Sequence, residues 1–387
     1  MRPGKLTLSD LNQARELWSL CFPEDSEAFV DWFFANQFPV LSNWSVWEKD
    51  RLRAAVYAMP YTLTCRGNNI PAALLLGVAT HPETRRRGLM RGLLHEVHTD
   101  LAESCAAVCL HPSDHSFYHK LGYSTVADHL RAHLPLSALH PFEPCGAIEP
   151  DPDFDRLATI NQQHSEHMEF YAIRDRGLLA RRFADLQTGG GFCIANEQAY
   201  AFVDPESERA DRSGIYYLPE FSYADITAGF SLLIALRDSA SGVRAFEFSL
   251  PITDANAWLS PQNAQHPTPN TQHPTPILTR EPFLMLYGLN WPAIVSGMRA
   301  DTQPATASPS KVIHILGEDA NWRITAANGT ASMSAVQTPS DITLSRDQFT
   351  RWICGYNDGG DSVSESAANA MCPSFFPTLS AYFFDRY

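Results

Sequence analysis

The sequence predicts a multidomain protein that combines α/β and α+β units. Its 387 residues are too many for one ordinary hydrophobic core, and a typical size of about 150 residues per domain suggests two to three domains. Helical and strand-like spacings of apolar residues alternate along the chain. A stretch rich in proline and glutamate, PFEPCGAIEPDPD at 141–153, lies between two such patterns and is typical of a linker.

The first unit is expected to occupy residues 1–145. Apolar residues recur at helical spacing over 8–21 and again around 29–33. Four strand-like runs follow: SVWEKD, RLRAAVYAMP, YTLTCRG and AALLLGVAT, the last ending at Thr80. A helix over 89–101, the short buried strand AAVCL and a helix and turn at HSFYHKLGY complete an α/β pattern.

The second unit, residues 146–281, is predicted to be α+β, with helical spacing over 154–184 and strands at YAFVDP, GIYYLPEFSYA and VRAFEFSLP. The tandem QHPTPN and QHPTPI at 265–277 is predicted to be an irregular surface loop, because proline removes a ladder donor. The third unit, residues 282–387, begins with a helix at LNWPAIVSGM. Strands are expected at KVIHILGE, NWRITAA and TASMSAV, with a hairpin turn at Asn328-Gly329 and a capping box of Ser345 and Gln348.

Composition excludes several classes of function. The formal net charge of -14 argues against a nucleic-acid partner, because phosphate binding requires a basic surface. The acidity favours cationic ligands or serves solubility alone. No apolar run reaches the ~18 residues of a membrane span, and the N-terminal residues lack the apolar segment of a signal peptide. The eight cysteines form no C-x-x-C pair, which is typical of reduced thiols and predicts a cytoplasmic protein.

One basic stretch, THPETRRRGLMRGLL at 80–94, stands out in this acidic chain. Its four arginines surround Gly88, between the apolar strand that ends at Thr80 and an amphipathic helix. Free N–H groups and the dipole at a helix N-terminus favour an anion, and arginine adds bidentate bonds to phosphate. The sequence therefore predicts a phosphate-binding loop, although neither the P-loop nor the dinucleotide pattern matches.

This loop resembles the R/Q-x-x-G-x-G/A segment of the GNAT N-acetyltransferases, which holds the pyrophosphate of coenzyme A. Here the segment runs from Arg85 to Met90, and Met90 departs from the usual glycine or alanine. Downstream, Phe117 and Tyr118 precede Gly122 and Tyr123 as in the family's F-Y-x-x-x-G-F segment.

A narrower resemblance, to the Eis (enhanced intracellular survival) acetyltransferases, covers nearly the whole chain. It is carried by V-A-T-x-P-x-x-R-R-R-G-x-x-R from Val78 to Arg91, by L-H-x-S from Leu110 to Ser113, and by the aromatic C-terminal residue. A bulky residue at the Met90 position is usual in that family. The resemblance implies two GNAT-like mixed sheets flanked by helices, the second without the cofactor loop, and a sterol-carrier-protein-like C-terminal domain. It also implies a homohexamer.

The resemblance implies an acetyl-CoA-dependent N-acetyltransferase that acts on primary amines. Tyr118 would be the general acid, and the C-terminal carboxylate of Tyr387 would be the general base. A backbone N–H near the strand end would polarise the thioester carbonyl. The expected acetyl-CoA contacts are Val78, Ala79, Thr80, Arg86, Arg87, Gly88, Leu89, Met90, Arg91, Ser113 and Asp114.

The acceptor is expected to be a small cationic amine or a lysine-bearing chain, bound by Glu24, Asp25, Trp32 and Phe33, since acids beside aromatic rings suit a cation. Each assignment has a structural alternative. Tyr118 also fits a core tyrosine, Ser113 and Asp114 a simple turn, and the aromatic tail a segment packed on its own domain. The alternative function is a non-catalytic protein that binds acyl-CoA or lipid on a GNAT scaffold.

Metal chemistry is not expected. The pairs His95/His98 and His164/His167 lack H-E-x-x-H and fit solvated or helix-capping histidines, and NDGGDS at 357–362 fits a turn. A second R-x-x-G segment, Arg174 to Gly177, follows the stretch HMEFYAI, which we expect to be helical. Without a preceding strand, this segment is predicted to be part of a helix pair and not an anion site.

Overall fold

The computed structural model describes residues 2–139, 142–166, 168–205, 214–251, 254–259, 276–300 and 310–356. The chain divides into two compact units. The first holds the described residues of 1–127, 169–172 and 283–356, and the second holds those of 128–168 and 173–282. No helix among these residues is long and apolar enough to cross a membrane.

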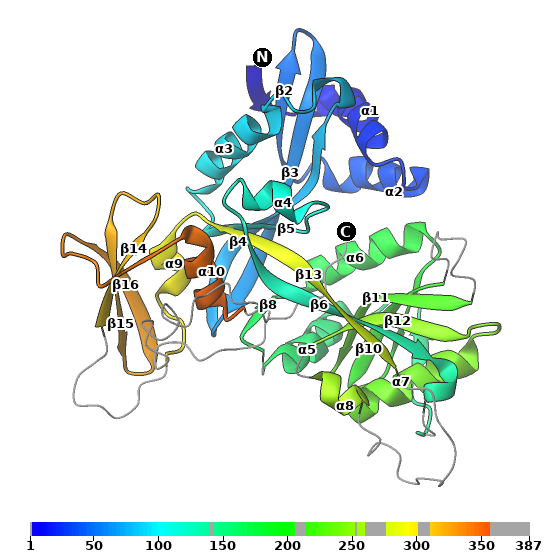
Figure 1. Cartoon of the computed structure of the whole chain (residues 1–387). Coiled ribbons are helices and arrows are strands. Elements are labelled where there is room, and N and C mark those ends of the chain that lie inside the picture. The colour runs from blue at the N-terminus through cyan, green and yellow to red at the C-terminus, as the bar shows by residue number, and fades with distance from the viewer. Residues whose placement is uncertain are drawn as a thin grey trace. The chain divides into compact units, whose positions relative to one another are not determined.

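The sheet of the first unit is mixed and follows the order β1-β2-β3-β4-β5-β13, with β8 paired to β3 (Figure 1). Its neighbours are antiparallel except β4 and β5, which are parallel. The strands are β1 (Arg2–Lys5), β2 (Ser42–Glu48), β3 (Arg51–Cys65), β4 (Asn68–Thr80), β5 (Ala107–Leu110), β8 (Phe170–Ala172) and β13 (Ile277–Gly288).

Helices cover both faces of this sheet. The helix α3 lies on one face, and α1 and α2 lie on the other (Figure 1). Successive side chains of β3 point to opposite faces of the sheet, and both faces carry apolar groups. Val56 is buried in one cluster with Leu94 of α3, whereas the ring of Tyr57 packs on Trp18 of α1. The helical elements are η1 (Leu8–Asp10), α1 (Leu11–Cys21), α2 (Glu27–Trp32), η2 (Phe33–Gln37), η3 (Pro82–Thr84), α3 (Leu89–Leu101) and α4 (His115–His119).

The C-terminal part of the first unit forms a separate sheet in the order β16-β15-β14-β17. Its expected turn is present, because Asn328 and Gly329 both have positive φ, as a two-residue hairpin of this kind requires. The capping box of Ser345 and Gln348 is also confirmed. The elements are α9 (Trp291–Val295), β14 (Ser310–Ile315), β15 (Asn321–Ala327), β16 (Thr330–Val336), β17 (Ile342–Leu344) and α10 (Arg346–Cys354).

The second unit is built on the strand order β6-β12-β11-β10-β9-β7. Its core gathers apolar side chains of β10, β11, β12 and α7, such as Phe221, Phe248 and Leu233. The elements are β6 (Ser124–Pro135), η4 (Leu136–Ala138), β7 (Ala147–Glu149), α5 (Phe154–Ser165), α6 (Arg176–Thr188), β9 (Phe192–Ala195), β10 (Ala199–Asp204), β11 (Ile215–Tyr223), α7 (Ile226–Ser239), β12 (Ala245–Leu250) and α8 (Ala255–Leu259).

Three expectations about elements were wrong. The stretch 141–153, expected to be a linker, contains the strand β7, which pairs with β9. The runs RLRAAVYAMP and YTLTCRG form one continuous strand, β3. Pro60 does not end the strand, because β2 pairs with β3 only as far as Ala58 and Pro60 therefore interrupts no hydrogen bond to β2. The helical stretch 154–184 is instead two helices, and HMEFYAI contains β8, whose residues pair with Leu63 to Cys65 of β3. This long-range pairing overrides the local helical spacing. The proline repeat at 265–277 begins outside the described residues, and only its last positions are seen.

Candidate active site

The site is built where β4 separates from β5. Their parallel pairing covers only Ala72 to Leu74 of β4, so the rest of the strand to Thr80 has no β5 neighbour. The register with β3 shifts at Gly77, where a bulge gives this residue a φ of +51°. A parallel pair that opens in this way leaves backbone groups of β4 available to a ligand.

The loop after β4 presents the N-terminus of α3. Gly88 is the N-cap in the left-handed region, with φ +78°, and no side chain caps the helix. By contrast, Asp114 caps α4 and Asp175 caps α6, each accepting hydrogen bonds from backbone N–H groups. The first-turn N–H groups of α3 therefore have no side-chain acceptor among the described residues, and the positive end of the helix dipole is left for an anion.

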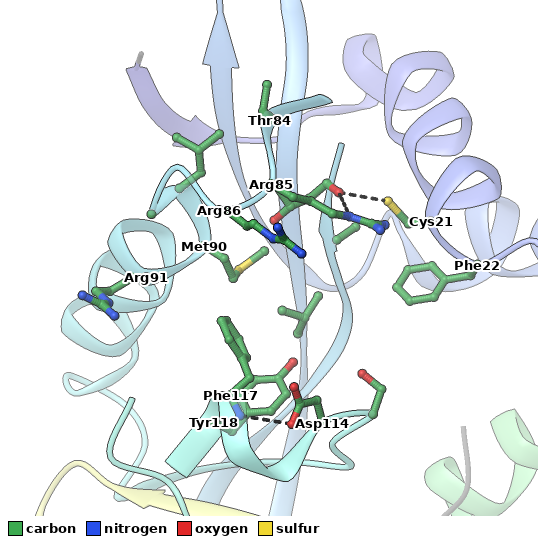
Figure 2. Close-up of a pocket in the computed structure, with 16 residues that line it drawn as sticks. Cys21, Phe22, Thr84, Arg85, Arg86, Met90, Arg91, Asp114, Phe117 and Tyr118 are labelled. Atoms are coloured by element: carbon green, nitrogen blue, oxygen red, sulfur yellow. Dashed lines mark hydrogen bonds between the residues drawn. The ribbon is translucent and has the colours of Figure 1, made fainter. Parts of the chain in front are cut away.

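A cavity of about 650 Å³ lies in front of this helix end. Figure 2 shows Arg85 and Arg86 on one side of it and Asp114, Phe117 and Tyr118 on the other. The cavity is lined by Cys21, Phe22, Val78, Ala79, Thr80, Thr84, Arg85, Arg86, Gly88, Leu89, Met90, Arg91, Ser113, Asp114, Phe117 and Tyr118.

The arginines of the loop have different surroundings. Arg85 Nε donates to the Thr80 carbonyl at 3.2 Å, and the same oxygen accepts from Cys21 Sγ at 3.5 Å (Figure 2). Arg86 is exposed, lines the cavity and has a φ of +63°. Arg87 does not line it and instead pairs with Glu48 at 3.1 Å, which lowers the pKa of that carboxyl. Arg86 is therefore better placed than Arg87 to bind an anion in the cavity.

The bulky Met90 is accommodated by the core beneath the loop. Its side chain is only 7% exposed and packs in the cluster that also contains Leu93, Leu94 and Val97 of α3. The departure from glycine or alanine thus leaves the backbone of the helix terminus open to the cavity.

Tyr118 closes the opposite side of the cavity. It lies in the short helix α4, is 7% exposed, and its hydroxyl makes no hydrogen bond to a described residue. Burial, with a smaller contribution from Asp114, raises the pKa of Tyr118 well above its usual value. The phenol is therefore protonated at neutral pH and can serve as a proton donor.

A histidine that the sequence placed among solvated or capping residues is instead partly buried behind Tyr118. His98 Nε2 lies 2.7 Å from the hydroxyl of Tyr123, and its ring stacks on Tyr287. Burial, with smaller contributions from His95 and Arg346, lowers the pKa of His98 to about 4. The imidazole is therefore neutral at physiological pH.

The low pKa of His98 makes stability depend on pH. Because the unfolded state, with a pKa of about 6.5, takes up the proton first, the contribution of neutral His98 is complete above about pH 6.5 and is lost as pH falls toward 4. Between pH 7 and pH 5 we expect the wild type to lose about 2 kcal/mol more unfolding free energy than His98→Gln. Urea denaturation at the two pH values measures this, and equal losses would contradict it.

The structure brings together every predicted acetyl-CoA contact except Arg87, and it places Tyr118 beside them. None of the four predicted acceptor residues lines the cavity: Asp25 accepts from Trp18 Nε1 at 2.7 Å, Phe33 is 3% exposed and packs on Trp18, and Glu24 and Trp32 lie elsewhere. Tyr387 lies outside the described residues. Which of these residues bind a ligand stays a prediction.

Sequence reasoning omitted five residues that line the cavity: Cys21, Phe22, Thr84, Arg85 and Phe117. Arg85 and Phe117 belong to the two segments in which the sequence analysis placed cofactor-binding and catalytic residues. Their positions in these segments could therefore have identified them as cavity residues. Cys21 and Phe22 come from the end of α1, far away in the chain, and no local pattern marks them. Burial raises the pKa of the Cys21 thiol, although Arg85 opposes this.

Other candidate sites are occupied by structural contacts. His164 is 1% exposed and its Nδ1 lies 2.9 Å from the Tyr223 carbonyl oxygen, whereas His167 and the 357–362 segment fall outside the described residues. Within the described ranges no cluster of three metal-ligating side chains occurs. Arg174 is buried against Glu220, and Asp175 caps α6, so the second R-x-x-G segment presents no open helix end even though β8 precedes it.

Residues 2–126, about a third of the chain, match the family model of the acetyltransferase (GNAT) domain. No curated protein sequence matches the chain significantly.

Solved structures resemble the chain over its full length. They include a conserved protein from Enterococcus faecalis V583, with 17% identity, 100% of this chain and 99% of that chain covered, and a TM-score of 0.78. A GCN5-related N-acetyltransferase from Anabaena variabilis has 15% identity, 100% coverage of both chains and a TM-score of 0.78. Eis1 from Mycobacterium abscessus has 15% identity, 100% coverage of both chains and a TM-score of 0.71. At these identities the likeness shows the fold.

Proposed function

We propose that this protein is an N-acetyltransferase that transfers the acetyl group of acetyl-CoA to a primary amine. One observation carries the proposal: within the GNAT domain, an uncapped helix N-terminus flanked by arginines and a buried, protonated tyrosine face each other across one cavity. An anion-binding group on one side and a proton donor on the other suit a substrate that carries both a pyrophosphate and a thioester.

The residues of the cavity fit acetyl-CoA as a substrate. The first-turn N–H groups of α3, with Arg85, Arg86 and Arg91 around them, would bind the pyrophosphate. The backbone of β4 beyond Leu74, which β5 does not pair, would hold the pantetheine arm and supply the N–H that polarises the thioester carbonyl. The thioester then lies toward Tyr118.

The proton transfers follow from this placement. The neutral amine attacks the carbonyl carbon, the C–S bond breaks, and the leaving thiolate takes a proton from the Tyr118 hydroxyl. A phenol of raised pKa can donate here because the same desolvation raises the pKa of a thiolate enclosed beside it. The proton lost by the amine goes to the C-terminal carboxylate of Tyr387, and it returns from there to Tyr118 through solvent.

Arg86 and Arg87 give a matched test of the anion site. Arg86→Ala is expected to weaken acetyl-CoA binding by about tenfold, because a charge-assisted bond to phosphate contributes about 1.5 kcal/mol. Arg87→Ala should change the Kd by less than about threefold, since Arg87 pairs with Glu48 and does not line the cavity. Titration calorimetry measures both constants. A larger effect at Arg87 than at Arg86 would contradict the assignment.

We also propose an Eis-like organisation: a catalytic GNAT domain over 1–145, a second GNAT-like domain over 146–281 and a sterol-carrier-protein-like domain over 282–387, in a cytoplasmic homohexamer. The full-length likeness to Eis1 supports this proposal at the level of fold. No nucleic acid is expected as a partner.

The role given to Tyr387 predicts that a C-terminal extension abolishes turnover. An added peptide converts the terminal carboxylate into an amide, which cannot accept a proton. A protein tagged at the C-terminus should therefore bind acetyl-CoA as the untagged protein does, yet transfer no acetyl group. An N-terminally tagged protein is the control, and full activity of the C-terminally tagged form would exclude this base.

Mass spectrometry of untagged protein, acetyl-CoA and a panel of aminoglycosides, polyamines and lysine peptides tests the proposed function. We expect an acetylated amine and an equal amount of free coenzyme A. If acetyl-CoA binds and no panel amine or protein lysine is acetylated, the alternative of a non-catalytic acyl-CoA-binding protein is favoured. Mass detection avoids thiol dyes, which the protein's own cysteines would consume.

A further inference from the structure

The side chain of Tyr118 is held by packing, within the apolar cluster that also contains Met90, Leu110 and Tyr123. Its helix, α4, has five residues, and its hydroxyl has no hydrogen-bond partner among the described residues. The ring lies edge-on to Phe117 at 5.0 Å and to Tyr123 at 5.6 Å between ring centroids. Phe117 is 38% exposed and gives little restraint, whereas Tyr123 is 1% exposed. Of the two aromatic rings beside Tyr118, Tyr123 is therefore the more strongly restrained.

Tyr123 is in turn fixed at both ends. Its backbone N–H donates to the Tyr118 carbonyl at 3.1 Å, across a turn in which Gly122 has a φ of +89°. Its hydroxyl lies 2.7 Å from His98 Nε2. Because burial lowers the pKa of His98 and raises that of Tyr123, the hydrogen bond joins a neutral imidazole and a neutral phenol.

The ring of His98 is held from its other side by residues near the C-terminal sheet. It stacks on Tyr287 with 4.1 Å between centroids and 22° between planes. The guanidinium of Arg346, at the start of α10, lies 4.6 Å from the centroid of Tyr287, and Arg346 also pairs with Glu318. This stack restrains the plane of the imidazole, whose Nε2 faces the Tyr123 hydroxyl.

We propose that His98 and Tyr123 are positioning residues, which act through the ring of Tyr118 and hold its hydroxyl toward the thioester sulfur. This role rests on the proposed function, since it concerns the acid of that reaction. Neither residue lines the cavity. The hydrogen bond between them should therefore affect the rate of the chemical step and leave acetyl-CoA binding unchanged.

Three single variants and one double variant test the role, with acetyl-CoA as donor and the fastest amine of the panel as acceptor. Tyr123→Phe and His98→Leu each break the hydrogen bond and should lower kcat about tenfold, with the KM for acetyl-CoA within about twofold. His98→Gln keeps an acceptor beside Tyr123 and should restore most of kcat. Tyr200→Phe is the control, because it removes a buried tyrosine hydroxyl that donates to Glu220 in the second unit.

The double variant Tyr123→Phe/His98→Leu separates positioning from stability. His98→Leu alone leaves a buried hydroxyl without its hydrogen-bond partner and should lower the Tm, whereas the double variant removes that hydroxyl and should regain much of the loss. Its kcat should stay low. A kcat that recovers with the Tm, or a wild-type kcat in Tyr123→Phe, would overturn the role while the transferase assignment stands. A wild type without transferase activity would overturn both.

Discussion

Replacing Tyr118 with phenylalanine is expected to lower kcat by at least about a hundredfold, the typical contribution of a general acid. The phenol is buried beside the cavity and protonated at neutral pH, so its removal leaves the departing thiolate without a proton donor. The Kd for acetyl-CoA should change by less than about twofold, because the anion-binding groups lie on the other side of the cavity. Steady-state kinetics and calorimetry measure the two effects separately.

Tyr57→Phe is the matched control for this substitution. Tyr57 is also buried in the first unit and its pKa is also raised, yet it does not line the cavity. Its kcat should remain near that of the wild type. If Tyr118→Phe retains more than about a tenth of the wild-type kcat, another group protonates the thiolate and the assignment of Tyr118 is wrong.

The second large effect is expected at Gly77, in the bulge of β4. A Cβ at this position would lie 2.2 Å from Trp18 Cζ3 and 2.8 Å from Tyr57 Cδ2, and the φ of +51° disfavours any other residue. Both neighbours belong to a packed aromatic cluster and cannot move freely. Gly77→Ala should therefore lower the unfolding free energy by about 3 kcal/mol or more. It should also abolish acetyl transfer, because the bulge shapes the part of β4 that is proposed to hold the pantetheine arm and the thioester.

Gly92→Ala is the control for the general effect of replacing a glycine by alanine. Gly92 lies within α3, where a Cβ meets no atom within 4 Å. Alanine there should raise the unfolding free energy by about 0.5–1 kcal/mol, since it favours the helix. Denaturation midpoints of the two variants test the contrast. A Gly77→Ala protein as stable as the wild type would show that the bulge tolerates a side chain.

The strand, loop and helix around Gly88 could be predicted from sequence because their signals are local. A strand, a loop with arginines around Gly88 and an amphipathic helix are consecutive in the chain, and the structure keeps them in that order. The short segment around Tyr118 was marked in the same way. The turn at Asn328-Gly329 and the capping box at Ser345 are further cases in which neighbouring residues decide the conformation.

The features that sequence reasoning missed depend on contacts between distant segments. Cys21 reaches the cavity only because α1 packs beside β4, and Arg87 turns to Glu48 of β2. The strand β8 forms inside an apparently helical stretch because β3 pairs with it. His98 shares a helix face with Leu94 and Leu101, but its partners Tyr123 and Tyr287 come from distant segments.

A crystal structure of the protein with acetyl-CoA tests the central claim most directly. We expect the pyrophosphate on the backbone N–H groups at the start of α3, beside Arg86, with the thioester along β4. The Tyr118 hydroxyl should lie within about 3.5 Å of the sulfur, close to hydrogen-bond reach. Acetyl-CoA bound elsewhere on the protein, or bound in this cavity with its sulfur out of reach of Tyr118, would contradict the account.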